Sequence, residues 1–171
     1  RLKLNPENRF ILFFGFIREY KGLDLLLRAM AEQCVRDLGV KLIVAGEFYE
    51  SEKPYFDLIH QLEIGDKITF HSHFISDDEV KYYFSAASLV VQPYRSATQS
   101  GVTQVAYHFN KPMIVTNVGG LAEIVPDGVC GYVVEPDPVA IAGAICDFFS
   151  GDENRFEVGI GEKKKEYSWD R

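Results

Sequence analysis

The chain has 171 residues, of which 47% are hydrophobic and 25% are charged. This size and composition are typical of one soluble globular domain and exclude a disordered or fibrous protein. Its 18 basic and 25 acidic residues leave a net charge of −7, which argues against a nucleic-acid partner. No apolar run approaches the roughly 18 residues that a membrane-spanning helix needs.

Three cysteines, Cys34, Cys130 and Cys146, are scattered along the chain without C-x-x-C spacing. We expect neither a disulfide framework nor a structural zinc from them, and a reducing cytosol fits this pattern best. The chain begins at Arg1 rather than at an initiator methionine, and no segment has the features of a signal peptide. We therefore expect a fragment of a longer cytoplasmic protein.

Apolar residues switch along the chain between strand-like runs and helical spacing. Six runs predict strands: Phe10–Phe14, Val40–Ala45, Lys67–Phe70, Leu89–Val91, Met113–Val115 and Gly131–Val134. The intervening stretches predict helices with apolar stripes that start at Leu23, Tyr55, Val80, Val102 and Ile141. Such alternation predicts an α/β fold, a doubly wound parallel six-stranded Rossmann-like sheet with helices on both faces. We expect this domain to span residues 1–150 and a polar tail or helix to span residues 151–171.

A sheet of this kind, with strand order 3-2-1-4-5-6, binds ligands beyond the carboxyl ends of its strands, where the strand order reverses. The loop after the first strand carries Arg18 and Lys21 between Gly15 and Gly22. The loop after the fourth strand ends in residues 100–102, where a helix begins. A helix N-terminus offers free N–H groups to phosphate, so these loops predict an anion site that suits a diphosphate.

Other ligand motifs are missing or incomplete. The chain has no G-x-x-x-x-G-K-[ST] sequence, and Gly15 is followed by Phe16 and Ile17 rather than by the glycines of a dinucleotide fingerprint. His71 and His73 alternate at the end of a strand and so face one way. No carboxylate or cysteine is placed to complete a metal site with them.

A series of short motifs follows in a fixed order between residues 10 and 150. They are Phe13-Phe14-Gly15 through Lys21-Gly22-Leu23-Asp24-Leu25-Leu26, Ile43-Val44-Ala45-Gly46-Glu47, Ala86-Ala87-Ser88 through Gln92-Pro93-Tyr94, Lys111-Pro112-Met113, Val118-Gly119-Gly120 through Glu123, and Asp127-Gly128 with Gly131-Tyr132. Together they resemble the C-terminal, donor-binding domain of a retaining family 4 ("group 1") glycosyltransferase of the GT-B fold.

This resemblance implies that the substrate is a nucleotide-diphospho-sugar and that no metal or other cofactor is needed. The phosphate-binding lysine of the family falls on Lys21. The arginine that usually follows the glycine is replaced by Phe16, and Arg18 is its substitute on the same loop. Lys21 and Arg18 would then stabilise the charge that develops on the leaving diphosphate.

The resemblance also implies the other donor contacts. Gly15, Phe16 and Gly46 border the donor, Phe74 and Ile75 lie near the nucleobase, and Ser100, Gly101 and Val102 offer their amides to phosphate. The family's glutamate pair is absent, because Ala97 and Val105 stand in its place. Gln99 or Gln104 would bind the donor hydroxyls instead, and the sequence does not choose between them.

The implied reaction is the transfer of a sugar, with retention, in polysaccharide or glycolipid biosynthesis. The acceptor, a sugar or a lipid-linked sugar, would be bound by an N-terminal domain that this chain lacks. The whole protein would work in the cytoplasm, with peripheral association at the inner face of the cytoplasmic membrane as an option. The alternatives are a non-catalytic nucleotide-binding module and another GT-B enzyme, such as a nucleotide-sugar epimerase.

Overall fold

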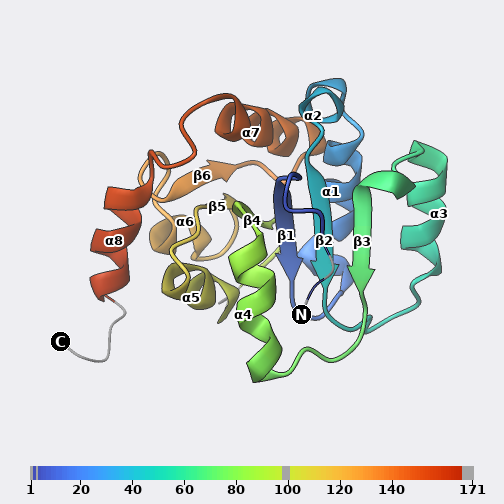
Figure 1. Ribbon diagram of the computed structural model, residues 1–171, viewed down its shortest axis with the longest axis horizontal. Coiled ribbons are helices and arrows are strands. Elements are labelled where there is room, and N and C mark those ends of the chain that lie inside the picture. Colours follow the sequence, from blue (N-terminus) through green and yellow to red (C-terminus); the bar gives the residue numbers. More distant parts are fainter. Residues whose placement is uncertain (1, 3, 98–100, 167–171) are drawn as a thin grey trace.

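The computed structural model describes residues 2, 4–97 and 101–166 and forms one sheet covered by helices (Figure 1). The sheet has six parallel strands in the order β3-β2-β1-β4-β5-β6. The strands are β1 (Phe10–Phe14), β2 (Lys41–Ala45), β3 (Ile68–His71), β4 (Leu89–Gln92), β5 (Met113–Thr116) and β6 (Gly131–Val134). The predicted fold class and strand order are confirmed, and each strand lies within a residue or so of its predicted range.

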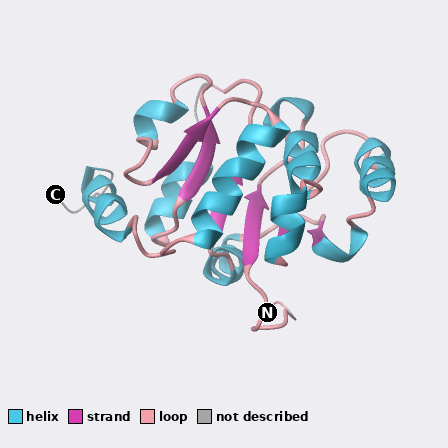
Figure 2. Ribbon diagram, turned by 90° about the horizontal axis from the view of Figure 1, so that it is seen from above, coloured by secondary structure: helices cyan, strands magenta, loops and turns pink. Residues whose placement is uncertain are grey.

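Helices cover both faces of the sheet, as Figure 2 shows from above. The α-helices are α1 (Leu23–Met30), α2 (Gln33–Leu38), α3 (Lys53–Leu62), α4 (Asp77–Ala86), α5 (Gly101–His108), α6 (Leu121–Ile124), α7 (Pro138–Ser150) and α8 (Glu157–Glu166). Two short 3-10 helices, η1 (Glu19–Lys21) and η2 (Gly65–Lys67), precede α1 and β3. Helix α2 was not predicted. Among the described residues, no helix is both long and apolar enough to cross a membrane.

The sheet is the centre of the hydrophobic core. Every residue of β4 and β5 is buried, as are most residues of β1 and β2, because helices lie on both faces of these central strands. Helix α1 contacts α2, α3 and α7, and α2 also contacts α7, whereas α8 packs against α5. The core extends into the segment predicted as a polar tail or helix, which forms α8, since Phe156 and Ile160 are buried there.

The N-terminus of helix α4 is capped by side chains. Ser76 and Glu79 form a capping box, in which each side chain satisfies a backbone N–H at the start of the helix. The same contact fixes the end of the loop that leads out of β3. This loop carries Phe74 and Ile75.

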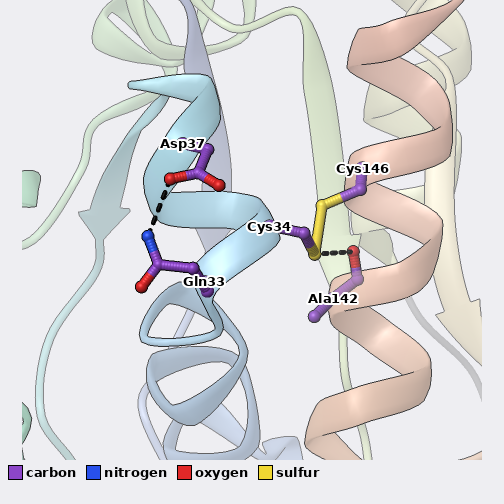
Figure 3. Close-up of a disulfide and its surroundings, with 5 residues drawn as sticks. All are labelled: Gln33, Cys34, Asp37, Ala142 and Cys146. Carbon is purple, nitrogen blue, oxygen red and sulfur yellow. Dashed lines mark hydrogen bonds between the residues drawn. A yellow bond between two sulfur atoms is a disulfide. The ribbon is translucent and has the colours of Figure 1, made fainter.

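Cys34 and Cys146 form a disulfide, which contradicts the expectation drawn from cysteine spacing (Figure 3). The two residues are 112 positions apart, but helices α2 and α7 pack side by side and bring their Cα atoms to 6.3 Å. Local spacing carries no information about such a pairing. Cys130 remains a free, buried thiol, and burial raises its pKa. The argument for a reducing compartment therefore loses the support that it took from the cysteines.

Candidate functional site

The loops after β1, β2 and β4 meet at the carboxyl edge of the sheet, where strand order reverses between β1 and β4. The backbone of the loop after β1 lies against the end of β2: Gly15 N–H donates to the Ala45 carbonyl at 2.9 Å. A Cβ atom on Gly46 would lie 1.9 Å from the Gly15 carbonyl oxygen, and Gly46 has a φ of +146°. Only glycine permits this approach, which closes one side of the expected ligand site.

Lys21 and Arg18 lie together on the loop after β1. Lys21 is the last residue of η1 and is partly buried, whereas Arg18 directly precedes η1 and is exposed. Burial lowers the pKa of Lys21, and the nearby Arg18 guanidinium lowers it further. Within the described ranges, neither cation forms an ion pair with a carboxylate. Two close, unneutralised cations make a site for an anion.

Because Gly15 has no side chain, the amine of Lys21 can lie close to its backbone. A Cβ atom at Gly15 would lie 3.2 Å from Lys21 Nζ and 3.9 Å from Val102 Cγ2. These contacts place the lysine amine and the start of α5 on the same side of the loop after β1. The lysine, the glycine and the helix N-terminus are thus brought together as predicted.

The loop after β4 is tied to the loop after β1 by contacts that the sequence did not indicate. Arg95 donates two hydrogen bonds to the Asp24 carboxylate, at 2.7 and 2.6 Å, and its backbone N–H donates to the Tyr20 carbonyl at 2.6 Å. A Cβ atom on Gly22 would lie 1.9 Å from the Pro93 carbonyl oxygen. Because Asp24 already binds Arg95, this arginine is neutralised and leaves Arg18 and Lys21 as the cations of the site.

The predicted contacts at the start of α5 are placed only in part. Gln99 and Ser100 lie outside the described residues. Gly101 and Gln104 are exposed on α5, and Val102 is partly buried. Gly119, in the loop after β5, comes so close to the loop after β4 that a Cβ atom there would lie 1.8 Å from the Ala97 carbonyl oxygen.

A cavity of about 120 Å³ lies next to the loop that carries the cations, since Gly15 lines it and a Cβ atom there would lie 3.2 Å from Lys21 Nζ. It opens between the loops after β1, β2 and β3, and it is lined by Phe14, Gly15, Phe16, Ala45, Gly46, Glu47, Phe74 and Ile75. Phe74 is 67% exposed and Phe16 is 48% exposed, so two aromatic side chains are accessible beside this opening. Five of the residues predicted to contact the donor therefore line one cavity: Gly15, Phe16, Gly46, Phe74 and Ile75.

His71 and His73 each have a partner other than a metal. His71 Nδ1 lies 3.0 Å from the Tyr83 hydroxyl, and His73 Nε2 lies 3.4 Å from a Glu79 carboxylate oxygen. Burial and the neighbouring His73 lower the pKa of His71. Over the part of the chain that the structure describes, no group of three histidine, cysteine or acidic residues could hold a metal ion.

Comparisons with known proteins point to glycosyltransferases. Residues 1–165 match the family model described as "Glycosyl transferases group 1". An uncharacterized glycosyltransferase of Methanocaldococcus jannaschii is 32% identical over 98% of this chain and 43% of its own length. The sucrose-phosphate synthase of Thermosynechococcus elongatus is 25% identical, with a TM-score of 0.83 over 95% of this chain and 41% of that one. The Anabaena protein HepE, solved with UDP-glucose, is 19% identical, with a TM-score of 0.79 over 93% of this chain and 43% of that one.

Proposed function

Since this chain belongs to the group 1 glycosyltransferases, we propose that it is the half of a sugar transferase that binds a nucleotide-diphospho-sugar. One observation carries the proposal: the loop after β1 holds two unneutralised cations, Lys21 and Arg18, and its Gly15 both borders Lys21 and lines an open cavity with aromatic walls. The cations suit a diphosphate, and the cavity suits the flat ring of a nucleobase. The UDP-glucose bound by a protein of the same fold supports this pairing.

In the proposed reaction, the bond between the sugar and the diphosphate breaks and negative charge grows on the leaving phosphate. Lys21 and Arg18 stabilise that charge, aided by the amides of Gly101 and Val102. Phe74 and Ile75 pack against the base. Of the two glutamines proposed to bind a hydroxyl of the donor, Gln104 is the one that the structure describes. The transfer proceeds with retention and without a metal or other cofactor.

The chain spans about two fifths of the length of the relatives that it matches. We therefore assign acceptor binding to the rest of the whole protein, which would transfer the sugar to a sugar or lipid-linked acceptor in polysaccharide or glycolipid synthesis. The same proposal places the whole protein in the cytoplasm, with peripheral association at the inner face of the cytoplasmic membrane.

A non-catalytic nucleotide-binding module is the second candidate. One observation favours it: Ala97 and Val105 occupy the two positions at which the sequence comparison with the family predicts glutamates. Both candidates bind the nucleotide, but only the transferase consumes a nucleotide-sugar. Turnover of the donor by the whole protein separates them.

The direct test is calorimetric titration of the 171-residue chain with UDP, GDP and ADP. We expect one of them to bind, and Lys21→Ala or Arg18→Ala to weaken that binding by about 1–3 kcal/mol, the worth of a charge-assisted contact. Lys53→Ala is a matched control, because Lys53 is an exposed lysine that pairs with Asp57 on α3. Binding that ignores Lys21 and Arg18, or binding of none of the three nucleotides, would contradict the proposal.

A further inference from the structure

Arg18 is the exposed cation of the site, and two tyrosine rings flank it. Its guanidinium carbon lies 4.2 Å from the centre of the Tyr49 ring and 5.7 Å from the centre of the Tyr20 ring. The shorter distance is well within the range of a cation–π contact. Tyr49 comes from the loop after β2, so the contact joins two loops of the site.

The backbone fixes Tyr49 opposite Arg18. Ile17 N–H donates to the Glu47 carbonyl at 2.9 Å, and Tyr49 N–H donates to the Ile17 carbonyl at 3.1 Å. These bonds form a short parallel bridge in which Ile17 is buried. Because side chains alternate along an extended segment, Phe16 and Arg18 share the opposite face. Tyr49 meets both of them there, since its ring also packs edge-on against Phe16 at 5.8 Å.

An aromatic ring and a carboxylate hold an arginine side chain in different ways. An ion pair would occupy the N–H donors of the guanidinium and neutralise its charge, leaving less for a phosphate. A ring beneath the planar group restricts a long, flexible side chain while the donors at its rim stay free. Arg18 forms no ion pair among the described residues, and its guanidinium lies against the two tyrosine rings, of which Tyr49 is the nearer.

We propose that Tyr49 is a positioning residue: its ring holds the Arg18 guanidinium ready to bind the diphosphate of the donor, without itself contacting the donor. This inference rests on the proposed function and deepens it. It gives the exposed aromatic pair Tyr49 and Phe16 separate roles, one toward the cation and one toward the cavity.

The experiment compares two probes of the 171-residue chain: the nucleoside diphosphate that binds best and the corresponding nucleoside, which lacks phosphate. Tyr49→Ala should weaken binding of the diphosphate about two- to fivefold, which is the size of an exposed cation–π contact, and leave binding of the nucleoside unchanged. Tyr49→Phe keeps the ring and should bind like the unaltered chain. Adding Tyr49→Ala to Arg18→Ala should have no further effect, because the contact that the tyrosine makes is already gone.

Tyr82→Ala is the matched control. Tyr82 is an exposed tyrosine on α4 with Lys81 at 5.3 Å from its ring centre, so the variant removes a similar contact that lies outside the candidate site. It should leave both probes unaffected.

Three outcomes would overturn the inference while the proposed function stands. These are normal diphosphate binding by Tyr49→Ala, equal losses for diphosphate and nucleoside, which would mean that Tyr49 contacts the base, and additive losses in the double variant. Failure of the unaltered chain to bind any diphosphate would overturn the proposed function, and this inference with it.

Discussion

Lys21 has an ammonium group whose surroundings disfavour its charge. Burial lowers its pKa below 10.5, and Arg18 adds to the effect. In the free chain the folded pKa is thus lower than the unfolded one. The contribution of this group to the free energy of unfolding therefore rises with pH between those two values. A bound diphosphate reverses the balance, because it stabilises the charged form.

This reversal predicts a pH dependence of binding. Affinity for the diphosphate should fall as the pH rises through the lowered pKa of Lys21. Binding near that pH should also take up protons, because the anion raises the pKa. Calorimetry in buffers with different enthalpies of ionisation measures this uptake. Lys21→Arg, whose side chain stays charged, should flatten the profile; an unchanged profile in that variant would exclude Lys21 as its source.

Gly22 and Gly39 form a matched pair of residues with a φ of 70° and 71°. Their surroundings differ, since a Cβ atom on Gly22 would strike the Pro93 carbonyl, whereas nothing lies within 4 Å of one on Gly39. Both alanine variants bear the strain of a left-handed backbone, about 1–2 kcal/mol.

Gly22→Ala should cost about 1–3 kcal/mol more than Gly39→Ala, because the loops after β1 and β4 must separate. Urea unfolding of the two variants measures the difference. Diphosphate binding should weaken in Gly22→Ala alone. Equal stabilities would show that the contact between these loops yields without cost.

At the scale of elements, the disulfide joins α2 to α7 on the surface of the molecule. Helix α2 has six residues and buries only Val35 among them, so it contributes few core contacts of its own. The bond between Cys34 and Cys146 closes a loop across most of the chain. A cross-link between distant positions restricts the unfolded chain and typically stabilises the folded one.

Removing this cross-link should lower the free energy of unfolding by about 2–4 kcal/mol. Chemical denaturation with and without a thiol reductant measures the loss. The double variant Cys34→Ser with Cys146→Ser should match the reduced chain and should not respond to reductant. A reductant-insensitive midpoint in the unaltered chain would show that the disulfide adds nothing to stability.

At the scale of the whole molecule, α8 packs as part of the domain. Phe156 and Ile160 are buried, and Lys164 donates a hydrogen bond to the His108 carbonyl at the end of α5. The sheet, its two helical layers and this last helix therefore share a continuous core.

Substitutions at two residues of α8 test whether this helix shares the core of the sheet. Ile160 is 2% exposed, whereas Val158 on the same helix is 76% exposed. Ile160→Ala should destabilise the chain by about 2–5 kcal/mol within a single unfolding transition. Val158→Ala should change stability by less than about 0.5 kcal/mol. A separate, early transition confined to α8, or equal effects of the two variants, would show that the helix unfolds independently of the sheet.

The sequence by itself determined the sheet and the edge of the sheet at which the candidate site lies. Apolar runs fixed the strands, and the alternation of strands with helices fixed their parallel order. The order in turn brought the loops with Arg18, Lys21 and Gly46 to one edge. These are consequences of local periodicity and of the rule that the crossover connections between parallel strands are right-handed.

Only the tertiary structure decided which side chains meet across the loops and helices. The pairing of Cys34 with Cys146, the binding of Asp24 by Arg95 and the contact of Tyr49 with Arg18 each join distant segments. Helix α2 was missed for a related reason: with one buried residue it has no apolar stripe to read. Periodicity records which face of an element is buried, whereas a contact between loops depends on how whole elements pack, and packing is set by the entire core at once.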